Sequence, residues 1–154
     1  MTRINLQHRL GVALAVGLSG GLVAQAITGS APLLGPDWGF CVCAAVGAFI
    51  AGFVLAPGFG IAGVRGWAIA GLTFIVATLL GAAVAVLFLP LEGFLARVEV
   101  PQLALDYASA MAIAPLFVLS ELFNTINVLL PWLGSILCIH LLAQYLRRPV
   151  ALNP

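Results

Sequence analysis

Long apolar segments alternate with short stretches of polar and turn-forming residues along the sequence. A transmembrane helix needs about 20 mostly apolar residues, and this pattern predicts four such spans. Pro57 and Gly58 end the second segment, since both residue types interrupt helices. Trp38 and Trp67 lie where interfacial aromatic residues are expected. The predicted spans cover about residues 10–28, 38–56, 67–89 and 126–146.

The stretch at 108–146 contains no arginine or lysine, yet it is too long for one crossing. A straight helix of that length would measure roughly 58 Å, about twice the thickness of the hydrocarbon core. A break is therefore expected at Pro115, at Pro131 or in the polar run at 120–127. Either residues 108–123 form a short interfacial or re-entrant helix before the last span, or both pieces cross the membrane.

The arginines decide between these two arrangements, because basic residues accumulate on the cytoplasmic side of membrane proteins. With four spans, Arg97 alone of the six basic residues lies opposite the N-terminus. With five spans, the arginines divide equally between the two sides. The sequence therefore predicts four spans with both termini in the cytoplasm. The arginines on that side are Arg3, Arg9, Arg65, Arg147 and Arg148.

Composition agrees with this topology, with 63% hydrophobic residues, 7% charged residues and a mean hydropathy of +1.19. Soluble domains carry about 25% charged residues, and 154 residues cannot enclose so many apolar side chains in one interior. We expect an all-α, polytopic transmembrane bundle that forms a single membrane domain over 1–154. Its expected location is a cell membrane, namely the bacterial inner membrane. The net charge of +1 and the scattered arginines indicate no nucleic-acid partner.

The first segment also has features of a secretory signal. Basic residues precede an apolar stretch, and Ala24-Gln25-Ala26 resembles a cleavage site. The apolar stretch is longer than in most signals, and it contains Gly17, Gly20 and Gly21, which suit helix packing. We therefore expect the segment to be retained as a span. Cleavage would leave the orientation of the remaining spans unchanged.

Small residues recur every four positions in the first three predicted spans. Residues four apart lie on one side of a helix, and such ridges let helices approach closely in lipid. Each ridge could contact a helix of the same chain or a helix of a partner. The ridges are Ala13-Gly17-Gly21, Ala44-Ala48-Gly52-Ala56 and Thr73-Ala77-Gly81-Ala85, and the residues expected at helix contacts are Gly17, Gly21, Ala48, Gly52, Ala77 and Gly81.

A polar patch is predicted just before the last span, where helical spacing puts four side chains on one broad side. The patch consists of Ser120, Glu121, Asn124 and Asn127. A carboxylate at membrane depth is costly and is a functional candidate, so the patch could conduct an ion or contact a partner. At the membrane surface, the same residues would form a hydrated bend between two apolar pieces.

Two further groups near the C-terminus are candidate sites. His140 lies in the inner half of the last span and could ligate a haem or chlorophyll-type pigment. Its simpler interpretation is a hydrogen bond to a neighbouring helix, and no other cofactor or metal is predicted. Arg147 and Arg148 follow the last span and are predicted to anchor the chain to anionic lipid headgroups.

The sequence contains no recognisable catalytic motif, so we expect no enzyme activity. The short loops and small-residue ridges favour an accessory or assembly subunit of a larger membrane complex. A small oligomeric transporter or channel that uses the polar patch is the first alternative, and a cofactor-binding protein that uses His140 is the second. The expected partners are the lipid bilayer and either other membrane subunits or further copies of the chain.

Overall fold

The computed structural model of the chain describes residues 6–29, 38–88 and 100–147, and the regular structure in these residues is helical throughout. Of the helices in the described ranges, five are long and apolar enough to cross a membrane. The elements are α1 (Leu6–Thr28), α2 (Trp38–Leu55), the short 3-10 helix η1 (Ala56–Gly58), α3 (Val64–Ala85), η2 (Val86–Phe88), α4 (Val100–Asn124) and α5 (Ile126–Arg147).

Helices α1, α2, α3 and α5 correspond to the predicted apolar segments, with ends that differ by a few residues. The predicted break falls in the polar run, since α4 ends at Asn124 and α5 begins at Ile126. Pro115 and Pro131 instead lie inside helices. The helix expected at 108–123 is longer than predicted, because α4 already begins at Val100.

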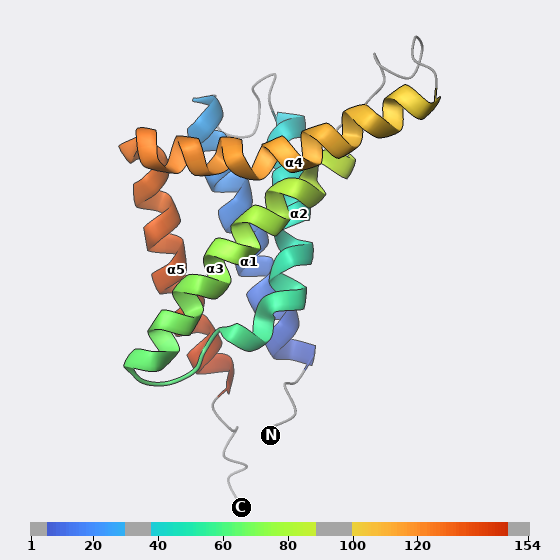
Figure 1. The fold of residues 1–154 in the computed structure, drawn as a ribbon. Coiled ribbons are helices and arrows are strands. Elements are labelled where there is room, and N and C mark those ends of the chain that lie inside the picture. The colour runs from blue at the N-terminus through green and yellow to red at the C-terminus, as the bar shows by residue number, and fades with distance from the viewer. Residues whose placement is uncertain (1–5, 30–37, 89–99, 148–154) are drawn as a thin grey trace, which may run out of the picture.

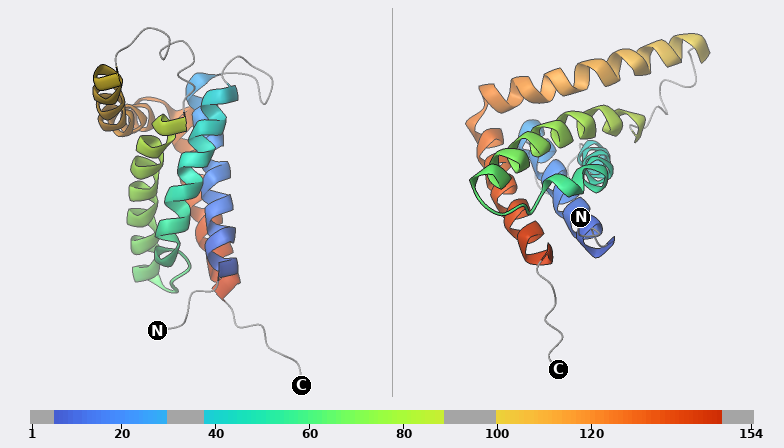
Figure 2. Two further views of the ribbon diagram at one scale, coloured as in Figure 1. Left: turned by 90° about the vertical axis from the view of Figure 1, so that its right-hand side faces the viewer. Right: turned by 60° about the horizontal axis from the view of Figure 1, so that its bottom comes forward.

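Helix α4 runs in a different direction from α1, α2 and α5. These three helices lie alongside one another, whereas α3 leans across them and α4 crosses near the end of the bundle at which α5 begins (Figures 1 and 2). The first half of α4 extends beyond the other helices (Figure 1). The start of α1 and the end of α5 lie together at the opposite end, where Arg147 donates a hydrogen bond to His8.

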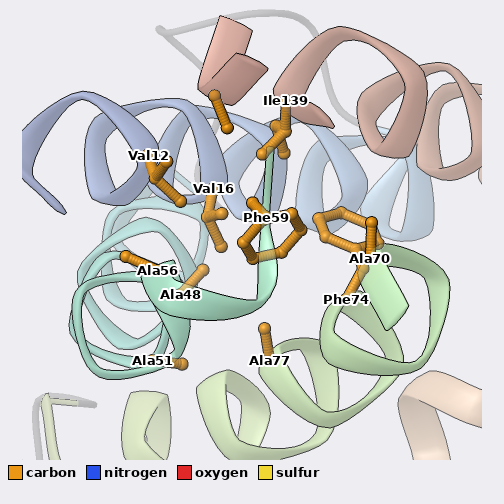
Figure 3. Close-up of a cluster of buried hydrophobic side chains, with 11 residues drawn as sticks. Val12, Val16, Ala48, Ala51, Ala56, Phe59, Ala70, Phe74, Ala77 and Ile139 are labelled. Carbon is orange, nitrogen blue, oxygen red and sulfur yellow. The ribbon is translucent and has the colours of Figure 1, made fainter. Parts of the chain in front are cut away.

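The buried core lies between α1, α2, α3 and α5 and centres on Phe59 (Figure 3). Phe59 follows η1, is fully buried, and meets the ring of Phe74 edge-to-face at a centroid distance of 6.3 Å. Phe74 in turn contacts Trp132 of α5, with ring centroids 5.3 Å apart. The connection between α2 and α3 is therefore packed into the bundle and positions the residues that follow it.

Candidate functional site

The small-residue ridges contact neighbouring helices of the same chain. A Cβ atom on Gly20 of α1 would lie 3.0 Å from the carbonyl oxygen of Ala44 in α2, and one on Gly52 would lie 2.7 Å from Cβ of Val16. A Cβ atom on Gly81 of α3 would lie 3.0 Å from Cα of Ala48. The ridge of α2 thus contacts α1 on one side and α3 on the other, and both contacts are intrachain.

The other predicted contact positions have the same role. Cβ atoms on Gly17 and Gly21 would meet α2 at Phe49 and Ala45, and Ala77 is fully buried in the core. These positions of the ridges therefore pack against helices of the same chain.

The polar patch lies at the corner where α4 ends and α5 begins. Asn124 donates a hydrogen bond to the hydroxyl of Ser120 over 3.2 Å, and the Thr125 hydroxyl lies 3.4 Å from a carboxylate oxygen of Glu121. Ser120, Asn124 and Asn127 are exposed, and Glu121 is half-buried. These bonds join residues one turn apart, so the described geometry of the patch is that of a polar bend.

His140 is fully buried at the other end of the bundle. The backbone N–H of Gly60 donates to its Nδ1 over 3.3 Å, and its Nε2 lies 3.0 Å from the side-chain amide of Gln144. Trp67 of α3 lies against the imidazole with ring centroids 4.2 Å apart. His140 therefore joins α5 to α3 and to the connection after η1.

The hydrogen bond from Gly60 determines the tautomer of His140. Because Nδ1 accepts, the neutral ring carries its proton on Nε2. The Gln144 nitrogen that lies 3.0 Å from Nε2 cannot accept that proton, so the hydrogen bond requires the amide to be turned until its oxygen faces the ring. Both ring nitrogens are engaged by protein groups. Ligation of a haem or chlorophyll-type metal by His140 stays a prediction, and it would require the bond from Gly60 to break, because the metal would either occupy Nδ1 or move the ring proton onto it.

Only glycine fits at position 60, beside His140. The φ angle of Gly60 is +78°, a left-handed conformation that side chains disfavour, and an added Cβ would lie 2.6 Å from the carbonyl carbon of Ala143. The close approach of Gly60 to α5 thus brings its N–H within reach of His140. The sequence analysis identified neither Gly60 nor Gln144, because nothing local links them to His140.

Arg147 has two acceptors within the protein. Its Nη2 donates to the carbonyl oxygen of Pro57 over 2.6 Å, and its Nε donates to Nε2 of His8 over 3.3 Å. His8 is buried, and its Nδ1 has no hydrogen-bond partner among the described residues. Arg147 therefore links α5, η1 and α1. Its role as a lipid anchor stays a prediction, and Arg148 lies outside the described residues.

An apolar cavity of about 470 Å³ lies between α4 and the rest of the bundle, with walls contributed by α1, α2, α3, α4 and α5. This size is within the usual range of ligand pockets, about 300–1,000 Å³. The space is partly open to the outside, so its apolar lining is accessible to the surrounding medium.

Three of the polar side chains on the cavity wall, those of Thr78, Trp132 and Cys43, are already hydrogen-bonded to the protein. The Thr78 hydroxyl donates to the carbonyl oxygen of Phe74 and accepts from Nε1 of Trp132, over 2.8 and 3.0 Å. The Cys43 thiol donates to the carbonyl oxygen of Phe88 over 3.0 Å. Ser19 adds one more hydroxyl to the wall. The cavity therefore suits hydrocarbon rather than a polar solute.

The candidate groups occupy separate places in the fold. The polar patch lies at the corner of α4 and α5, His140 and Arg147 lie toward the opposite end, and none of them lines the cavity. The cavity is the feature that the sequence analysis missed, since its walls come from segments distant in the chain. No protein-family model, curated protein or solved structure matches this chain.

Proposed function

We propose that α1, α2, α3 and α5 cross the membrane, that α4 lies at its outer surface, and that both termini are in the cytoplasm of a bacterial cell. The contact between Arg147 and His8 supports an even number of crossings, because it joins the start of α1 to the end of α5. The course of α4 across the bundle supports its exclusion from the spans. Arg9 and Arg65, at the starts of α1 and α3, agree with a cytoplasmic location for that end.

Fusions of green fluorescent protein to each terminus test this topology. The protein fluoresces when it remains in the cytoplasm and stays dark when it is exported unfolded, so both fusions are expected to fluoresce. Alkaline phosphatase, which is active only outside the cytoplasm, should be inactive at both termini. One fluorescent and one dark terminus would indicate an odd number of spans and would overturn the proposal.

We propose further that the protein is an accessory or assembly subunit of a larger membrane complex, which it contacts through α4. One observation supports this role above others: only 6% of the apolar stretch of α4 is buried, against 22% to 39% in the other long helices described. Leu116 on α4 is 66% exposed. A helix that extends sideways from a bundle and buries so little within its own chain suits attachment to a neighbouring subunit.

The geometry offers less to the two alternatives. A transport pathway through the polar patch would need Glu121 and its neighbours to face an internal space, and they lie outside the described cavity. A pigment on His140 would need a free ring nitrogen, and both nitrogens have protein partners.

Site-specific photo-crosslinking tests the subunit role. A benzophenone side chain is placed at Leu116 of α4 and, as the matched control, at Leu18 of α1, which is 70% exposed and faces lipid in the proposed topology. Irradiation of intact membranes should give a discrete adduct with a different protein from position 116 and none from position 18. Equal labelling at both positions, no adduct at 116, or an adduct only with a second copy of this chain would contradict the proposal.

A further inference from the structure

One side of α4 has the spacing of a buried helix face without being buried. Positions three and four apart form the stripe that a helix normally packs against its neighbours. In α4 this stripe faces the cavity, and Ile113 within it is 61% exposed. Toward the end of α4 the stripe does pack against the bundle, since Val118 and Leu122 contact the buried cluster that includes Val128. The stripe residues are Ala110, Ile113, Ala114, Phe117 and Val118.

The opposite wall of the cavity is built from small side chains. Ala44 of α2 and Ala77, Gly81 and Ala85 of α3 line it. Some of these residues also form the tight helix contacts described above, so the same small residues that allow α2 and α3 to approach leave room beneath α4. The cavity is therefore bounded on one side by α2 and α3, which pack closely against each other, and on the other side by the apolar stripe of α4.

We propose that this cavity binds the hydrocarbon chain of a membrane phospholipid, which completes the packing of α4 on the bundle. Water is a poor occupant, because a buried water needs 2–4 polar partners and the polar groups of Thr78 and Cys43 are already hydrogen-bonded. An acyl chain is apolar and flexible, and the surrounding bilayer supplies it at high concentration. The bound lipid acts as part of the interface between α4 and α3.

This inference does not depend on the proposed subunit role, since it concerns the inward side of α4 and the partner would contact the outward side. The two fail independently. If the chain bound no lipid, the crosslinking experiment at Leu116 would still test the subunit role. If no partner were found, the lipid-binding experiment would still test the cavity.

Substitutions that fill the cavity test the proposal. Ala114→Phe on α4 and Ala82→Phe on α3 each direct a ring into the cavity, because both alanines line it. Ala112→Phe and Ala83→Phe are the matched controls, since they lie on the same helices but not on the cavity wall. The purified chain is titrated in detergent with palmitoyl-oleoyl phosphatidylglycerol, and native mass spectrometry counts the retained lipid.

We expect the unsubstituted chain and both controls to retain the lipid, and both filling variants to bind it about tenfold more weakly. Added lipid should raise the melting temperature of the unsubstituted chain and the controls but not of the filling variants. Equal retention in all five proteins would overturn the proposal. Retention of an isoprenoid in place of the phospholipid would also overturn it.

Should the filling variants fail to fold, Trp132 decides the question, because it lines the cavity. In chains that retain a single tryptophan, phospholipid brominated along its acyl chain should quench Trp132 more strongly than Trp38, which lies at the first residue of α2. Equal or weaker quenching of Trp132 would show that no acyl chain enters the cavity.

Discussion

Gly47→Ala is expected to lower the free energy of unfolding by about 2–3 kcal/mol, since overpacking of a close contact costs about 1–3 kcal/mol and sometimes more. A Cβ atom at this position of α2 would lie 2.6 Å from the backbone nitrogen of Ala85 and 2.9 Å from its Cα, and it would also meet the carbonyl oxygen of Gly81. These are backbone atoms of α3, so no side-chain rotation relieves the overlap and the two helices must separate. Unfolding in mixed micelles with increasing sodium dodecyl sulfate, followed by circular dichroism, measures the change.

Gly71→Ala in α3 is the matched control. Nothing lies within 4 Å of a Cβ atom there, and alanine is a better helix former than glycine by up to about 1 kcal/mol. We therefore expect Gly71→Ala to leave stability unchanged or to raise it slightly. Equal effects of the two substitutions would show that α2 and α3 do not approach as closely as described.

Local sequence signals predicted the helices and the break in the long C-terminal stretch. The break falls near Thr125 because the polar residues around it favour a hydrated bend over a continuous apolar helix. The first turns of α4 were missed, because the long stretch without basic residues on which the prediction rested begins only at 108, whereas α4 begins at Val100.

The partners of each helix could not be predicted in the same way. The four-residue spacing in α1, α2 and α3 indicated ridges, but a ridge does not identify the helix that occupies it. The three-dimensional structure pairs Gly52 with Val16 and Gly81 with Ala48. The cavity could not be predicted from local sequence either. The small residues that line it are of the same types as those at the tight helix contacts, so the sequence does not distinguish the two.

His140→Leu is expected to lower the free energy of unfolding by about 2–4 kcal/mol, because each buried polar group left unsatisfied costs about 1–3 kcal/mol. Leucine fills much of the same space but accepts no hydrogen bond. The backbone N–H of Gly60 and the side chain of Gln144 would both lose their described partner. The same micelle titration measures the loss, and Leu141→Ala, on the half-exposed side of α5, should have a much smaller effect.

His140→Asn separates this structural role from the ligation of a pigment. The Asn side-chain oxygen can occupy a position close to that of Nδ1 and accept from Gly60, so His140→Asn should restore part of the stability that His140→Leu loses. If His140 only joins α5 to the connection after η1, the absorbance spectrum of the purified protein is the same in all three chains. A Soret or bacteriochlorin band that is present in the unsubstituted chain and lost in both variants would instead identify His140 as an axial ligand. The bond from Gly60 would then have to be given up when the pigment binds, because Nε2 carries the proton while Nδ1 accepts.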